Sequence, residues 1–340
     1  MKISHAPRSA RRNLRIAIYA LIGLLGAALG LTTGVARADG PAPAAVGSPA
    51  ESASFSVDVR GDGERHVLLI PGLGSPGAVW DDTVEALVAD GFRTHTVTLA
   101  GFAGQPPLAN VGRGTFLPRV HGDLLAYAQS LGGRVALVGH SLGAAMSLWL
   151  ASSEPDQFGP VVAADGVPFL PALTQPDATA ESARPQADGL HAMISAMSPE
   201  AYDRQSAFTL TTMVTDADEA RRLAGISRGS DPASIGEAIR DLMTRDLRPG
   251  LAAVTAPVLL IGAGAPAATP EAAAELEHRY RAQIAAAPQG RVVMLPKARH
   301  FVMVDARERF VALTREHLAA VPTVTAPESS TVSPAVAAGR

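Results

Sequence analysis

A serine in a tight, glycine-flanked turn is the first feature of this chain that could do chemistry. Ser141 is the centre of Gly139-His-Ser-Leu-Gly143, which follows an apolar run at residues 135–138 and precedes small residues that suit a helix. In a sharp strand-to-helix turn the serine hydroxyl projects above the sheet edge, and the N–H of Leu142 points at the same space. Because a serine hydroxyl is nearly inert at neutral pH, catalysis also needs a histidine base, an acid and a second N–H donor.

The same short pattern occurs a second time. Gly225-Ile-Ser227-Arg-Gly229 also matches Gly-x-Ser-x-Gly, but it follows Ala-Arg-Arg-Leu-Ala, which is typical of a helix rather than a strand. The local context therefore favours Ser141 as the nucleophile and argues against Ser227.

A base is expected at His300. This histidine comes just after an apolar strand pattern at residues 291–295 and before a helix, in Pro296-Lys-Ala-Arg-His-Phe. The loop at the carboxyl end of a parallel strand is where such sheets gather functional groups. His140 adjoins the serine, but in so tight a turn it points away, so we expect it to pack or hydrogen-bond beneath the turn.

Strand and helix patterns alternate along the body of the chain. This alternation indicates an α/β fold with a mostly parallel twisted sheet and helices on both faces. Strands are expected at 54–59, 66–70, 94–99, 135–139, 161–165, 256–262 and 291–295, and helices at 80–90, 117–131, 142–153, 270–286 and 306–319.

The alternation stops between residues 168 and 250, where only helical patterns occur. We interpret residues 168–250 as a helical cap inserted into a core made of residues 53–167 and 251–320. The expected cap helices are 188–197, 199–214, 217–223 and 232–245. The methionines of the cap either line an adaptable apolar pocket or pack the cap onto the core. These residues are Met193, Met197, Met213 and Met243.

From about Phe55 to Ala320 the chain resembles the α/β-hydrolase family. Pro71-Gly-Leu-Gly-Ser75 stands where the family has its oxyanion loop, Gly139–Gly143 resembles its nucleophile turn, and Ala298-Arg-His-Phe301 resembles its histidine loop. The resemblance implies the α/β-hydrolase fold and an oxyanion hole formed by the N–H groups of Leu73 and Leu142.

The acid departs from the commonest pattern of that family. Many members place an aspartate after the strand equivalent to residues 258–261, but Gly262-Ala-Gly-Ala-Pro contains none. Asp165 ends the preceding strand pattern, and the order Ser141, Asp165, His300 agrees with the order in the family. We therefore predict Asp165 as the acid, with Glu271 and Asp246 as alternatives. Asp305 is expected to cap a helix.

The two ends of the chain differ from its body. Residues 1–38 combine basic residues, an apolar run at 16–35 and the small-x-small sequence Ala36-Arg-Ala38, which is the layout of a signal peptide cleaved after Ala38. The alternative is an uncleaved membrane anchor formed by residues 16–35. Residues 39–52 are expected to be a flexible linker, and residues 321–340, rich in Pro, Ser and Thr, a disordered tail.

Charge and cysteine usage exclude several classes of function. Residues 1–38 hold six basic and no acidic residues, so cleavage takes the formal net charge from −3 to −9, which argues against a nucleic-acid partner. The chain has no cysteine, which excludes disulfides, a cysteine nucleophile and thiolate metal sites.

The sequence thus predicts an exported serine hydrolase, periplasmic or extracellular, that cleaves a small-molecule ester or related acyl compound. A Ser141–His300–Asp165 triad and an acyl-enzyme would carry the reaction, and no metal or organic cofactor is needed. An acyltransferase or another α/β-hydrolase chemistry uses the same triad. The alternative outside catalysis is a binding protein whose cap closes over an apolar ligand.

Overall fold

The computed structural model describes residues 54–319. The predicted signal peptide, linker and tail lie outside this range. Within it, no helix is both long enough and apolar enough to cross a bilayer.

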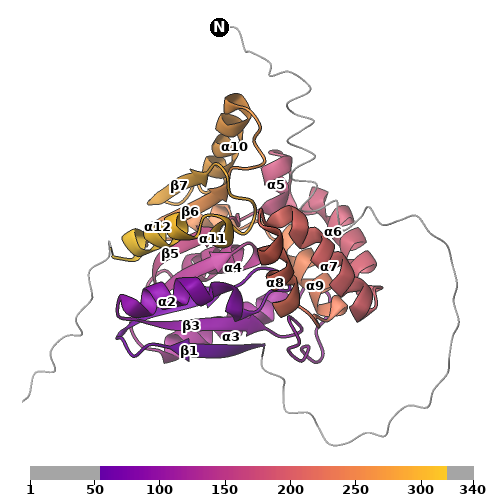
Figure 1. Ribbon diagram of the computed structural model, residues 1–340, viewed down its shortest axis with the longest axis horizontal. Coiled ribbons are helices and arrows are strands. Elements are labelled where there is room, and N and C mark those ends of the chain that lie inside the picture. The colour runs from indigo at the N-terminus through magenta and orange to yellow at the C-terminus, as the bar shows by residue number, and fades with distance from the viewer. Residues whose placement is uncertain (1–53, 320–340) are drawn as a thin grey trace, which may run out of the picture.

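A single twisted sheet forms the centre of the molecule (Figure 1). Its seven strands lie in the order β1-β3-β2-β4-β5-β6-β7, and β1 alone runs antiparallel, paired with β3 at the edge. The strands are β1 (Phe55–Arg60), β2 (Arg65–Ile70), β3 (Phe92–Leu99), β4 (Val135–His140), β5 (Phe158–Ala164), β6 (Val258–Ala263) and β7 (Gly290–Leu295). The mostly parallel sheet predicted from the sequence is confirmed.

Alternate residues of the strands enter two separate apolar layers. Along β2, Leu68 and Ile70 pack with one cluster, and Val67 and Leu69 pack with the other. Since successive strand side chains point to opposite faces, a continuous apolar run serves both layers at once. Helices α3 (Phe116–Ser130), α4 (Leu142–Ser153) and α10 (Pro270–Gln283) contribute to the first, and α2 (Asp81–Ala89) and α12 (Arg307–Ala319) to the second.

Between β5 and β6 the described chain is helical. The helices of this insertion gather at one side of the sheet in Figure 1. They are α5 (Leu170–Thr174), α6 (Ala180–Ser195), α7 (Pro199–Met213), α8 (Ala217–Ile226) and α9 (Pro232–Thr244), followed by the 3-10 helix η2 (Pro249–Ala253). We call residues 168–250 the helical insertion.

Polar contacts fasten the helical insertion to the loops above the sheet. The N–H of Asp231 donates to the carbonyl of Gly101 at 2.7 Å, and the buried carboxylate of Asp241 accepts from the N–H of Leu117 at 2.8 Å. Since these bonds join main-chain groups of the core to the ends of α9, they set the height of that helix above the carboxyl ends of the strands.

One expectation about a local role is wrong. Asp305 is not a helix cap: it closes the short helix α11 (Val302–Asp305) and accepts from the N–H groups of Thr215 and Arg299, 2.9 and 2.8 Å away. It thereby ties the loop before α11 to the helical insertion, a long-range contact that local spacing does not reveal.

Candidate active site

Ser141 occupies a strained turn between β4 and α4. Its backbone has φ 53° and ψ −115°, and its N–H donates to the carbonyl of Ala164 on β5 at 2.9 Å. The flanking glycines leave no space for a side chain: a Cβ on Gly139 would lie 2.2 Å from the carbonyl oxygen of Gly143, and one on Gly143 would lie 2.1 Å from that of Ile70. A residue held in such a conformation is typical of a functional position.

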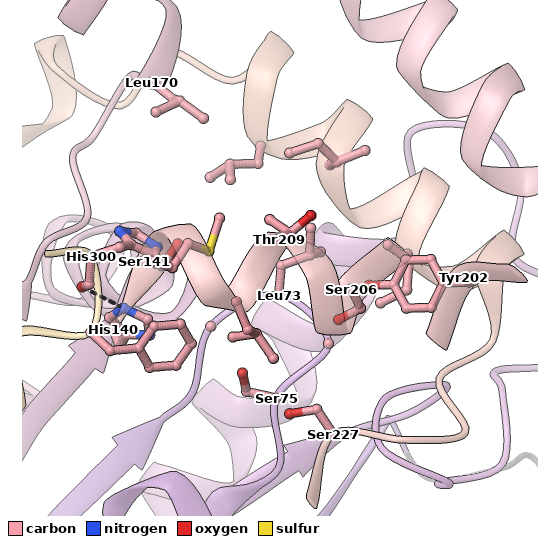
Figure 2. A pocket seen from close by; sticks show the side chains of 18 of the residues that line it. Leu73, Ser75, His140, Ser141, Leu170, Tyr202, Ser206, Thr209, Ser227 and His300 are labelled. Carbon is pink, nitrogen blue, oxygen red and sulfur yellow. Dashed lines mark hydrogen bonds between the residues drawn. The ribbon is translucent and has the colours of Figure 1, made fainter. Parts of the chain in front are cut away.

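Asp165 and His300 meet beside this turn. The Nδ1 of His300 lies 2.7 Å from Oδ2 of Asp165, and both side chains are more than nine-tenths buried. A carboxylate only accepts hydrogen bonds, so Nδ1 carries the proton and Nε2 keeps its lone pair. In Figure 2 the Ser141 side chain lies next to this imidazole. No hydrogen bond joins the two within residues 54–319, so proton transfer needs a small shift of either side chain.

Two further donors hold the other oxygen of the carboxylate. Oδ1 of Asp165 accepts from the N–H of Ala263 at 2.7 Å and from the hydroxyl of Tyr280 at 2.6 Å. Tyr280 comes from α10, and burial raises its pKa well above the ordinary value, so it remains a donor. The carboxylate is therefore fixed from three sides, a position that sequence reasoning predicted only in part because it missed Tyr280.

The other candidate acids lie elsewhere. Asp246 pairs with Arg248 at 2.6 Å, and Glu271 is exposed in the first turn of α10. The carboxylate that the structure brings to His300 is that of Asp165.

His140 supports His300 from below. Its Nε2–H donates to the carbonyl of His300 at 3.1 Å, and the two rings lie 4.6 Å apart between centroids. Burial and the neighbouring His300 ring lower the pKa of His140 well below its ordinary value, so it stays neutral. Beneath the turn, His140 thus makes the packing and hydrogen-bond contacts expected of it.

Two backbone N–H groups near Ser141 lack an acceptor among the described residues. Leu142 is the first residue of α4, where an N–H has no partner inside the helix. The loop that holds Leu73 comes close, because a Cβ on Gly72 would lie 3.3 Å from the Cβ of Ser141. Such a pair of free donors suits an oxygen that gains negative charge.

A pocket of about 110 Å³ opens from Ser141 and His300 toward the helical insertion (Figure 2). Its wall is mostly apolar, and much of it comes from α7 and α9. Among the four methionines of the insertion, Met213 lines this pocket, whereas Met243 is fully buried and Met193 and Met197 pack against the core. Three of the four methionines therefore pack within or against the core and do not line this pocket.

A smaller cavity of about 40 Å³ also reaches the serine. It shares Ser141, His300, Leu170 and Leu242 with the larger pocket and is closed by Asp165, Tyr280 and neighbouring apolar residues. The serine thus borders a large and a small space, which is the arrangement needed to hold two unequal arms of one substrate.

The described residues contain no cluster of three or more side chains suited to bind a metal. Ser227, the serine of the second Gly-x-Ser-x-Gly match, ends α8 and lines the large pocket rather than contacting His300. This position of Ser227 in the pocket wall could not be predicted from the sequence, because it depends on how α8 lies over the sheet.

Comparison with known proteins places the chain in a family. Residues 67–313 match the model of the alpha/beta hydrolase family, and the chain belongs to that family. It is 27% identical to a pimeloyl-[acyl-carrier protein] methyl ester esterase of Nitrosomonas europaea, over 76% of this chain and 98% of the relative. It is 34% identical to a pyrethroid hydrolase of Sphingobium wenxiniae over 32% and 38% of the two chains.

A solved structure shares the fold at low identity. A thermophilic esterase from Thermogutta terrifontis superposes with a TM-score of 0.60 at 19% identity, covering 77% of this chain and 92% of the esterase. The likeness supports the α/β-hydrolase fold predicted from the sequence.

Proposed function

We propose that the protein is a serine hydrolase that cleaves a small-molecule ester through Ser141, His300 and Asp165. The observation that carries the proposal is the 2.7 Å contact between His300 Nδ1 and Asp165, which leaves Nε2 free next to a serine in a strained turn. The esterases among the relatives support the reaction class.

The geometry gives each group a role in the reaction. His300 Nε2 takes the proton of Ser141 as Oγ bonds to the ester carbonyl carbon, and the N–H groups of Leu73 and Leu142 stabilise the resulting oxyanion. The imidazolium then protonates the departing alkoxide, which leaves an acyl group on Ser141. A water that loses its proton to His300 attacks this acyl-enzyme, and His300 returns that proton to Ser141 Oγ as the bond to the acyl group breaks and the carboxylic acid is released. Asp165 holds the tautomer of His300 and stabilises its cation.

Turnover of chromogenic short-chain esters tests the proposal. The wild-type protein is expected to release p-nitrophenol from p-nitrophenyl butyrate, and Ser141→Ala to lose about 10⁴-fold or more of kcat, because the nucleophile is gone. If wild type and Ser141→Ala are both folded and equally inactive across acetate, butyrate and hexanoate esters, the chain is a binding protein instead.

We also propose that the protein is exported, on the basis of residues 1–38. N-terminal sequencing of the mature protein from the producing cells is expected to start at Asp39. A protein that retains Met1 in a membrane fraction would support the anchor alternative, and one that retains it in the cytoplasm would refute export.

A further inference from the structure

Two serine hydroxyls at the far end of the large pocket lack protein partners. Ser75 is 3% exposed and Ser227 is 7% exposed, and both side chains line the pocket. In Figure 2 both lie apart from Ser141 and His300. Neither hydroxyl makes a hydrogen bond within residues 54–319. Each hydroxyl is therefore free to donate a hydrogen bond to a group that enters the pocket.

The hydroxyl of Thr209, which also lines this pocket, is by contrast already paired, because it donates to the carbonyl of Gln205 at 2.9 Å.

The structure holds these two serines in place. Ser230 Oγ accepts from the N–H of Ala103 at 2.9 Å and lies 3.2 Å from the carbonyl oxygen of Ser227 and 3.4 Å from that of Gly74. Its single proton is shared between these two carbonyls. Ser230 thus links the loop that carries Ser75 to the end of α8 that carries Ser227, so the two hydroxyls belong to one site, which we call the distal serine pair.

Charge around the pocket restricts what could bind there. Among the described residues that line it there is no Asp, Glu, Lys or Arg. His140 stays neutral because burial lowers its pKa. A charged group placed there would lose its hydration without gaining an opposite charge, and a plain alkyl chain would leave both hydroxyls unpaired.

We infer that the distal serine pair binds an uncharged oxygen-bearing group, such as a ketone or ester carbonyl, on the longer arm of the ester substrate. The inference rests on the proposed function, because the distal serine pair would bind part of the same ester in the same pocket. A carbonyl there accepts hydrogen bonds from the two hydroxyls while the aliphatic wall covers the chain between it and Ser141. The substrate class is thus an ester with a second, neutral carbonyl in its longer arm.

Matched esters test the inference. Two sets of esters are compared, and each contains three kinds of compound. The first is a plain medium-chain ester, the second has one methylene of that ester replaced by a ketone at successive positions, and the third ends in a carboxylate. One set varies the acyl arm and the other the alcohol arm. In one of the sets, we expect the ester with a ketone at one position to have a kcat/KM about 3- to 10-fold higher than that of the plain ester. The kcat/KM of the ester that ends in a carboxylate should be lower than that of the plain ester.

Variants assign that preference to the serines. Ser75→Ala and Ser227→Ala are expected to remove most of it by raising KM for the ketone ester relative to KM for the plain ester, because the contact is the same in the ground and transition states. Ser130→Ala, which changes an exposed serine at the end of α3, is the control and should keep the preference. Reaction with a fluorophosphonate shows that each variant is folded with a working triad.

Two results would overturn the inference. The first is a wild-type protein that hydrolyses plain esters but prefers no ketone position in either set. The second is a preference that survives in both serine variants. In each case hydrolysis of the plain ester still supports the proposed function, whereas a wild-type protein inactive on every ester refutes both.

Discussion

Asp165 adopts a backbone conformation that few residues other than glycine tolerate, with φ 42°. The turn directs its carboxylate between His300, Ala263 and Tyr280. Its place at the end of β5 was predictable because the carboxyl ends of parallel strands meet at one edge. The contribution of Tyr280 was not predictable, because the sequence of a helix does not show which strand end a tyrosine hydroxyl will reach.

Replacing this carboxylate tests its role. Asp165→Asn is expected to lower kcat for ester hydrolysis by about 10³- to 10⁴-fold, because an amide in that place favours the wrong tautomer of His300. Glu271→Gln, an equal change at an exposed carboxylate near the same strand ends, should leave kcat within about twofold. Steady-state kinetics on purified variants gives the comparison, and full activity in Asp165→Asn would remove it from the triad.

At the scale of elements, the pattern of apolar residues was enough to locate every strand of the sheet, while some boundaries depended on contacts between elements. β5 begins at Phe158, before the predicted residue 161, although Gly159-Pro160 suggests a turn. The register of β4 and β5 shifts between Val135 and Leu137, and an irregular pairing of this kind accepts a proline.

The start of α6 was predicted too far along the chain, and contacts again explain the difference. The helix begins at Ala180, not at residue 188, because Thr179 and Ser182 cap its first turn reciprocally, and it continues through Pro185. A proline inside a helical pattern normally marks its end, and it is the packing of α6 on α9 that overrides this signal.

The strand-to-helix turn allows a test at the level of elements. Gly143→Ala is expected to destabilise the fold by about 3 kcal/mol or more, or to prevent folding, because the new Cβ would lie 2.1 Å from the carbonyl of Ile70 on β2. The control is Gly122→Ala on the exposed side of α3, where no atom lies within 4 Å of the new Cβ. It should stabilise by about 0.5–1 kcal/mol. Urea unfolding measures both; equal effects would contradict the crowding described for this turn.

At the scale of the whole molecule, buried histidines make stability depend on pH. Burial lowers the pKa of His95 and of His121 to about 4, and it also lowers the pKa of His66, His140 and His317. Unfolding returns each to an ordinary pKa of about 6.5, so below that pH the unfolded chain binds more protons than the folded chain. Stability is therefore expected to fall as the pH is lowered from about 7 to about 5.

Urea midpoints across that range measure this dependence. His121→Phe keeps a ring to stack on Trp149, 4.1 Å away between centroids, and removes one titrating group, so its midpoint should vary less with pH. A wild-type midpoint that stays constant or rises toward pH 5 would show that these histidines are accessible to protons in the folded state.

The proposed active site combines a serine raised by the sheet, groups from two strand ends that activate it and a helical insertion that covers it. Peptide mapping after reaction with a fluorophosphonate tests it most directly, because the probe bonds only to an activated nucleophile. We expect one adduct, on the peptide that carries Ser141, which is lost in Ser141→Ala and retained in Ser227→Ala. An adduct on Ser227, or one that persists in folded Ser141→Ala, would contradict it.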